Sequence, residues 1–81
     1  MIYIQVYVPD KNRFFDYKVS RKINICNLKS LIVESIYNVK CNDEFIKCNY
    51  ALMDFNCRKR LKDDVNLYNY PVYNGYKFLL I

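Results

Sequence analysis

The sequence contains no histidine, no tryptophan and a single glycine. Nucleophilic catalysis by cysteine usually needs a histidine base, and a glycine-rich phosphate loop needs several neighbouring glycines, so the chain lacks the residues for both. None of its cysteines forms a Cys-x-x-Cys pair, whereas zinc sites usually need closely spaced ligands. We therefore expect no catalytic residue, no metal site and no cofactor. We interpret the cysteines as structural free thiols: Cys26, Cys41, Cys48 and Cys57.

Long hydrophobic runs are also missing. No apolar stretch approaches the ~20 residues that cross a bilayer, so we expect no direct membrane insertion. The first ten residues alternate and lack a basic segment, which indicates a strand and not a signal peptide. We therefore predict a cytoplasmic location, where a disulfide framework is not expected. A length of 81 residues predicts one domain, residues 1–81.

Acidic residues are fewer than basic ones, and the formal net charge is +5. The basic residues are scattered, except for a cluster within residues 58–62 that Asp63 and Asp64 follow directly. We interpret the basic residues as a solvated surface, and nucleic-acid binding as the lesser alternative. The adjacent Asp63 and Asp64 side chains point apart, so we predict a solvated turn or helix start there and not a catalytic pair.

The first twenty residues predict a hairpin of two strands. Residues 2–8 alternate between aliphatic and mostly polar or aromatic side chains, and residues 15–20 alternate again. A period of two is typical of half-buried strands. The residues between them, Pro9 to Asn12, are those that favour a tight turn.

The hydrophobic period then changes to that of a helix. Aliphatic residues recur at i, i+3 and i+7 spacing, which places them within an arc of about 80° on one helix face. Asn24 precedes them and is suited to be the N-cap, so Cys26 falls in the first helical turn. We expect the helix to end near Val39 and Lys40. Its predicted stripe is Ile25, Leu28, Ile32, Ile36 and Val39.

The remaining residues predict further strands. We expect one from Glu44 to Tyr50 that contains Cys48, and a final one from Tyr76 to Ile81 after an Asn-Gly turn. Residues 51–60 are irregular and fit either an extended hairpin or a long loop. The chain therefore predicts an α+β domain, with a mixed sheet of four to five strands and one helix packed across it.

The spacing of apolar residues from Leu61 to Leu80 resembles that of ubiquitin. The resemblance implies a ubiquitin-like β-grasp fold, in which the hydroxyl of Tyr70 bonds a backbone amide beneath a loop. A buried phenol needs such a partner because an unpaired polar group costs about 1–3 kcal/mol. The residues expected to serve this fold as structural anchors are Ile25, Leu28, Ile32, Ile36, Leu61, Leu67, Tyr70, Val72, Phe78 and Leu80.

A closer resemblance is to the YukD/EsaB kind of small ubiquitin-like proteins in Gram-positive type VII secretion systems. Residues 25–36 look like the helix of that family. Residues 66–78 look like its Leu-x-Asp-Tyr-x-Ile-x-Asp-Gly-x-x-Leu pattern, with Asn66-Leu67-Tyr68-Asn69-Tyr70 at the start and Asn in place of both Asp residues. The resemblance implies an accessory protein that binds other components of the secretion machine. A generic ubiquitin-like interaction domain of a larger protein or complex is the alternative.

Carrier chemistry is not expected. Ubiquitin and sulfur-carrier proteins of this superfamily react through a flexible Gly-Gly tail, and glycine makes such a tail thin enough to enter an adenylating site. This sequence ends inside the predicted last strand, and its one glycine, Gly75, lies in a predicted turn. We therefore predict a non-conjugated protein that is not an enzyme and has no small-molecule substrate.

Residues 46–61 form a longer stretch than the matching part of either family. Leu52, Met53 and Phe55 lie in it, and they form an apolar tip for a partner if they are exposed. The alternative is that they fold back on the core. Tyr7 and Lys47 fall at expected outward positions near the sheet, and Tyr is common at interfaces. The predicted partner-binding residues are therefore Tyr7, Lys47, Leu52, Met53 and Phe55.

Overall fold

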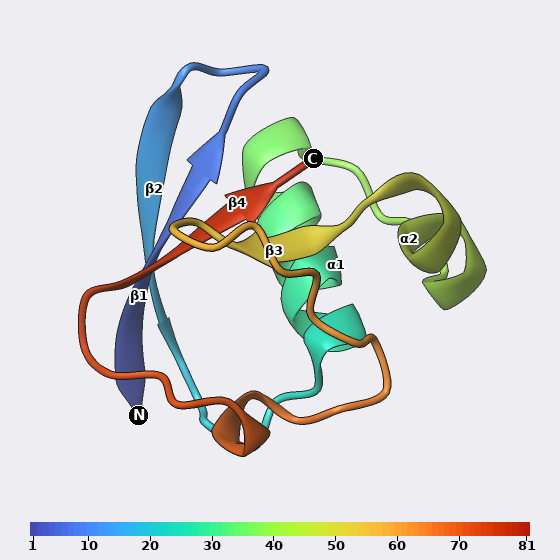
Figure 1. Ribbon diagram of the computed structural model, residues 1–81. Coiled ribbons are helices and arrows are strands. Elements are labelled where there is room, and N and C mark those ends of the chain that lie inside the picture. Colours follow the sequence, from blue (N-terminus) through green and yellow to red (C-terminus); the bar gives the residue numbers. More distant parts are fainter.

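The computed structural model describes residues 1–81 as four strands, two α-helices and one 3-10 helix (Figure 1). In chain order they are β1 (Ile2–Val8), β2 (Arg13–Val19), α1 (Ile25–Tyr37), α2 (Asp43–Asn49), β3 (Leu52–Asp54), η1 (Leu67–Asn69) and β4 (Tyr76–Leu80). The sheet order is β2-β1-β4-β3. Strands β1 and β4 are parallel, and the other pairs are antiparallel. The predicted mixed sheet with a helix across it is confirmed.

The predicted N-terminal hairpin is confirmed. Strands β1 and β2 pair antiparallel from Ile2 opposite Val19 to Val8 opposite Arg13. The alternation seen in the sequence sets the burial, because every second residue of β1 faces the core. Asn12 closes the turn at a φ of 52°, a backbone conformation that Asn tolerates better than most residues.

Helix α1 begins where the sequence predicts. The Asn24 side chain accepts a hydrogen bond from the Asn27 amide at 2.8 Å and so caps the first turn. The helix ends at Tyr37, because Asn38 adopts a left-handed conformation with a φ of 55°. Val39 lies beyond that end and is 48% exposed, so its predicted place in the buried stripe is wrong.

The predicted strand from Glu44 to Tyr50 is wrong, because residues 43–49 form helix α2. Asn42 caps this helix by accepting the Phe45 amide at 2.8 Å, and two acidic residues in the first turn suit the positive end of the helix dipole. Ile46 is completely buried against the core. An apolar run this short does not distinguish a strand from a helix by its period. Cys48 therefore lies on a helix and is exposed.

The core lies between the sheet and α1. It contains the inward side chains of β1, the buried face of α1 and the apolar residues of the last twenty positions. All ten predicted anchors belong to this core except Ile36 and Tyr70, which pack against it. Cys26, in the first turn of α1, is also part of the core, and all four cysteines are free.

Residues 51–61 form a compact hairpin, which was one of the two alternatives. One carboxylate oxygen of Asp54 accepts the amides of Asn56 at 2.9 Å and Cys57 at 3.0 Å. The chain then returns beside β3, where the Leu61 amide donates to the Leu52 carbonyl at 2.8 Å. Leu52 itself is completely buried. Its prediction as part of an exposed tip is therefore wrong, because its side chain faces the core.

The last section follows the resemblance to ubiquitin closely. The Lys62 amide donates to the Tyr70 hydroxyl at 2.9 Å, so the predicted role of Tyr70 is confirmed. Gly75 has a φ of +86° in the predicted turn before β4. Beyond β4, the backbone of Ile81 pairs with that of Ala51 in both directions. Neither α-helix has the length and hydrophobicity that a membrane crossing requires.

Candidate protein-binding surface

The outer face of the sheet, opposite the core, carries an apolar row that crosses all four strands. Phe14 of β2 lies opposite Tyr7 of β1, Tyr7 lies beside Leu79 of β4, and Leu79 lies opposite Met53 of β3. Because paired residues of neighbouring strands share a face, these four side chains form one continuous line. Helix α1 covers the other face of the sheet (Figure 1).

Phe55 completes this row from the turn after β3. Its ring centroid lies 5.9 Å from that of Tyr7 and 5.2 Å from that of Phe14, and the Tyr7 and Phe14 centroids are 5.0 Å apart. These separations are typical of stabilising aromatic pairs. The Phe55 amide donates to the Lys77 carbonyl at 3.1 Å and fixes the backbone there. We refer to Tyr7, Phe14, Met53, Phe55 and Leu79 as the outer-face cluster.

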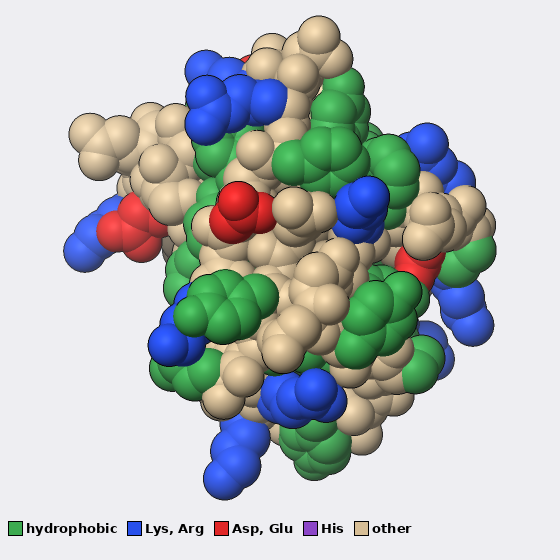
Figure 2. Space-filling model, turned by 90° about the vertical axis from the view of Figure 1, so that its left-hand side faces the viewer, with side chains coloured by type: hydrophobic (Ala, Val, Ile, Leu, Met, Phe, Trp, Pro, Cys, Tyr) green, Lys and Arg blue, Asp and Glu red, His purple; other side chains and the backbone are tan.

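The outer-face cluster is partly exposed and has cationic groups around it. Phe14 is 37% exposed, Leu79 is almost covered, and the other three members are half-buried. The Lys77 ammonium lies 5.6 Å from the Phe14 ring centroid, and the Arg58 guanidinium lies 5.1 Å from that of Phe55. Figure 2 shows the side of the molecule on which β1 and β2 lie, where hydrophobic side chains are interspersed with Lys and Arg that outnumber the acidic ones.

The structure therefore unites three of the five residues predicted to bind a partner: Tyr7, Met53 and Phe55. Leu52 is in the core. Lys47 lies on α2, which packs against α1, so it is not part of the outer face. The Lys47 ammonium lies 3.5 Å from an Asp64 carboxylate oxygen, which raises the pKa of Lys47. Sequence reasoning missed Phe14 and Leu79, although the alternation of side chains along each strand places them on the outer face.

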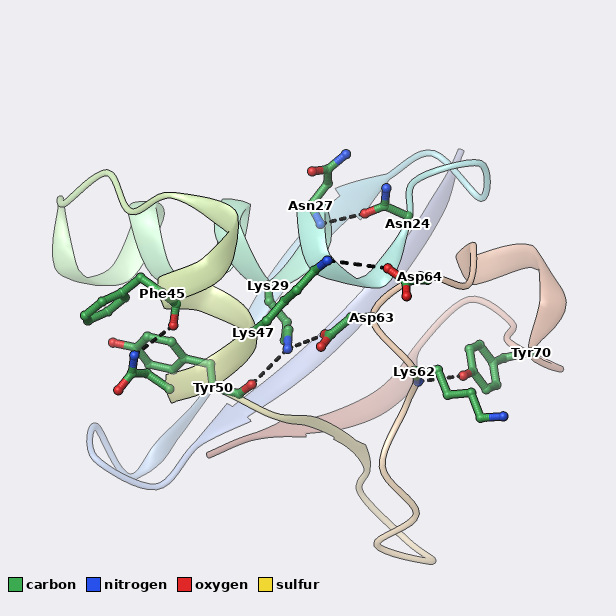
Figure 3. Close-up of polar contacts among 11 residues, drawn as sticks. Asn24, Asn27, Lys29, Phe45, Lys47, Tyr50, Lys62, Asp63, Asp64 and Tyr70 are labelled. Atoms are coloured by element: carbon green, nitrogen blue, oxygen red, sulfur yellow. Dashed lines mark hydrogen bonds and ion pairs between the residues drawn. The ribbon is translucent and has the colours of Figure 1, made fainter.

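Sequence reasoning also missed a buried ion pair. Lys29 of α1 is completely buried, forms an ion pair with Asp63 and donates to the Tyr50 carbonyl at 2.8 Å (Figure 3). The turn predicted at Asp63 and Asp64 is present and Asp64 is exposed, but Asp63 is paired and not solvated as predicted. One signal was present in the sequence, because Lys29 stands four residues after Ile25 and three before Ile32, on the apolar face of α1.

A second polar contact lies beneath the turn that follows β3. The Tyr76 hydroxyl donates to a carboxylate oxygen of Asp54. This hydrogen bond raises the pKa of Tyr76 to about 12, because the phenolate would face the Asp54 charge. The same bond, together with the Cys57 and Asn56 amides, lowers the pKa of Asp54. Asp54 is therefore ionised, and its carboxylate holds the turn in place through these hydrogen bonds.

No protein-family model and no curated protein matches this sequence. Solved structures do match its fold. The UBL domain of Plasmodium falciparum Dsk2 is 20% identical with a TM-score of 0.74, over 98% of this chain and 93% of that one. ATBAG1, solved in complex with HSP70, is 16% identical with a TM-score of 0.76 over all of this chain, which spans 40% of the ATBAG1 chain. The predicted ubiquitin-like β-grasp fold is confirmed.

Proposed function

We propose that this chain is a ubiquitin-like interaction domain that binds a protein partner through the outer-face cluster. The observation that carries the proposal is the uninterrupted row Phe14–Tyr7–Leu79–Met53, which crosses the whole sheet on the face without a helix. Aromatic and Met side chains are enriched in protein interfaces, where a few central anchors supply most of the binding energy. The partly exposed rings and the flanking cations of this row have that composition.

The chemistry of the cluster supports binding and not catalysis. The rings of Tyr7, Phe14 and Phe55 hold one another in place, so little side-chain freedom is left to lose when a partner docks. The Tyr7 hydroxyl already donates to the Asn12 side chain. Apart from this engaged hydroxyl, none of the five side chains can transfer a proton, and none is an activated nucleophile. We therefore propose a non-enzymatic role.

The finer proposal is that the partner is a component of a type VII secretion machine and that the chain acts in the cytoplasm. What supports it is the residue-level resemblance of 25–36 and 66–78 to the YukD/EsaB kind of protein. Those two segments form α1 and the η1–β4 region, which pack the core. Fold-level packing residues do not determine a partner, so this proposal needs a direct test.

The test is affinity capture from source cells followed by mass spectrometry, with wild-type chain and two matched variants. Phe14→Ser removes an anchor of the outer-face cluster, whereas Phe45→Ser removes a Phe of similar exposure on α2; the two are 37% and 48% exposed. We expect proteins captured by the wild type and by Phe45→Ser to be lost with Phe14→Ser. Loss of about 2 kcal/mol at an anchor weakens binding roughly thirtyfold.

Two results would count against these proposals separately. Equal capture by Phe14→Ser and by the wild type would show that the outer-face cluster is not the binding surface. Capture that depends on Phe14 but contains no secretion component would leave the interaction domain in place and reject the type VII assignment. A circular dichroism spectrum of each variant would establish that it is folded.

A further inference from the structure

A second surface lies beside the turn after β3, on the core-facing side of the sheet. A cavity of about 220 Å³ opens there between residues 54–61 and residues 70–78. Its floor consists of Leu61, Val72 and Phe78, which are part of the core, and its walls include the rings of Tyr70 and Tyr76. None of the residues of the outer-face cluster lines it.

Each hydroxyl and carboxylate oxygen inside this cavity already has a hydrogen-bond partner. The Tyr76 hydroxyl donates to Asp54, whose other oxygen accepts two backbone amides. The Tyr70 hydroxyl accepts the Lys62 amide. The cavity therefore presents ring faces and aliphatic carbons, and the group that enters it should be apolar, because an unpaired polar group would lose its hydrogen bonds with water.

The rim of the cavity is cationic. Lys59 and Arg60 line it, and both are exposed. The two acidic residues that follow in the sequence do not neutralise them: Asp63 pairs with Lys29 and Asp64 with Lys47 (Figure 3). These are the two ion pairs of the structure, so no carboxylate of the chain pairs with the basic residues of 58–62. Only Asp54 adds negative charge to the lining, and its oxygens are engaged.

We infer that this cavity binds a short acidic segment of a partner protein, whose one large apolar side chain enters between Tyr70 and Tyr76 while flanking carboxylates meet Lys59 and Arg60. The inference goes beyond the proposed function, because it assigns a second surface and the chemistry of what it binds. The cavity is smaller than the ~300–1,000 Å³ of sites for drug-sized molecules, which suits a single side chain. The hydroxyl and carboxylate oxygens of its interior already have partners, so the interior suits an apolar side chain better than the polar edge of a nucleic-acid base.

The first experiment uses the wild-type chain and measures protection of a cysteine. Cys57 lines the cavity, whereas Cys48 lies on α2, and both are exposed. The probe is the peptide acetyl-Glu-Glu-Phe-Glu-Glu-amide, and the rate of alkylation by iodoacetamide is followed at each cysteine by mass spectrometry. We expect saturating peptide to slow alkylation of Cys57 about fivefold or more and to leave Cys48 unchanged, since alkylation requires access to the thiol.

The second experiment tests the rim with two double variants of equal charge change. Lys59→Glu/Arg60→Glu alters the rim, and Arg21→Glu/Lys22→Glu alters another exposed Lys-Arg pair away from the cavity. We expect the first variant to weaken binding of the labelled peptide about tenfold or more, and the second less than about threefold, because only the rim charges contact the peptide. Fluorescence anisotropy measures both.

Several results would overturn the inference. Equal alkylation rates at Cys57 with and without peptide would show that the cavity is empty at saturation. Equal protection by a peptide with Ala in place of Phe would reject the apolar insertion, and equal weakening by both double variants would reject the rim contacts. Protection of Cys57 by oligodeoxythymidylate, and not by the peptide, would assign the surface to nucleic acid. None of these results would alter capture through Phe14, so the proposed function is tested separately.

Discussion

Lys29 and Asp63 form an ion pair in which the lysine is completely buried and the aspartate side chain is 17% exposed. The pair joins α1 to the loop before η1, and the Lys29 ammonium also reaches the carbonyl of Tyr50, at the end of α2. The Asp63 carbonyl in turn accepts the Cys26 amide at 3.1 Å, so the same residue also satisfies the first turn of α1. One buried lysine thus connects three segments that are distant in the sequence.

Replacing Lys29 should therefore destabilise the protein strongly. In Lys29→Met the Asp63 carboxylate loses its counter-charge and the Tyr50 carbonyl loses its donor. Breaking one side of a buried pair costs about 3–5 kcal/mol, a large part of the ~5–15 kcal/mol that holds a typical domain together. Urea unfolding followed by circular dichroism measures the loss. A Lys29→Met midpoint equal to that of the wild type would contradict this account.

The matched control is Lys47→Met. Lys47 pairs with Asp64, whose side chain is 91% exposed. Water already solvates both charges of this pair, so its removal should leave the unfolding midpoint almost unchanged. The double variant Lys29→Met/Asp63→Asn should recover part of the loss, because it removes the unpaired charge as well as its partner.

Tyr70→Phe should cost about 1 kcal/mol of unfolding free energy, since it deletes the acceptor of the Lys62 amide but keeps the ring against the core. Thermal unfolding measures the loss of stability in Tyr70→Phe and in the control variant Tyr68→Phe. Tyr68 is 55% exposed and its hydroxyl has no partner within the chain, so that variant should match the wild type. Equal effects of the two substitutions would show that the Tyr70 hydrogen bond contributes nothing.

The contact between Tyr76 and Asp54 predicts a pH dependence at both extremes. The pKa of Tyr76 is raised from 10.0 to about 12, so its contribution to stability is complete below pH 10 and is lost as the pH rises toward 12. The pKa of Asp54 is lowered from 3.8, so its contribution is present above that value and is lost as the pH falls through the folded-state pKa. The stability difference between wild type and Tyr76→Phe should form a plateau between these limits.

This difference is obtained by measuring the unfolding free energies of the wild type and of Tyr76→Phe across the pH range. A second readout is the ultraviolet titration of the tyrosines, in which Tyr76→Phe should lack the phase near pH 12. A stability difference that does not vary with pH would show that the hydrogen bond is not formed in solution.

Gly75→Ala should destabilise the turn before β4 through the backbone alone. The φ of Gly75 is +86°, and no atom lies within 4 Å of the position that an added Cβ would take. A positive φ costs a residue with a Cβ about 1 kcal/mol. Gly75→Asn should cost less, because Asn tolerates this region better, and thermal unfolding orders the two. If Ala and Asn prove equally harmless, the turn does not require glycine.

Most of the fold could be predicted from the sequence, but less of the candidate protein-binding surface could. The hairpin, α1 with its Asn24 cap and the Tyr70 contact follow from residues within a few positions of each other or from the resemblance to ubiquitin. The outer-face cluster was found only in part, because its members come from four strands and a turn. Leu52 and Phe55 stand three positions apart, an odd spacing that places them on opposite faces once β3 forms, but the irregular pattern of residues 51–60 did not predict β3.

The sequence alone determined where hydrophobic side chains alternate with a period of two or recur with the period of a helix, because those patterns depend only on near neighbours along the chain. The helix over residues 43–49 has its own local signals, the Asn42 cap and the acidic first turn, but its short apolar run did not distinguish it from a strand. Only the tertiary structure decided that Lys29 is buried, since this depends on segments that meet only in the folded protein. The same holds for the cationic rim of the cavity. The charges of this rim are unpaired because Lys29 and Lys47, far away in the sequence, bind Asp63 and Asp64, the two aspartates beside it.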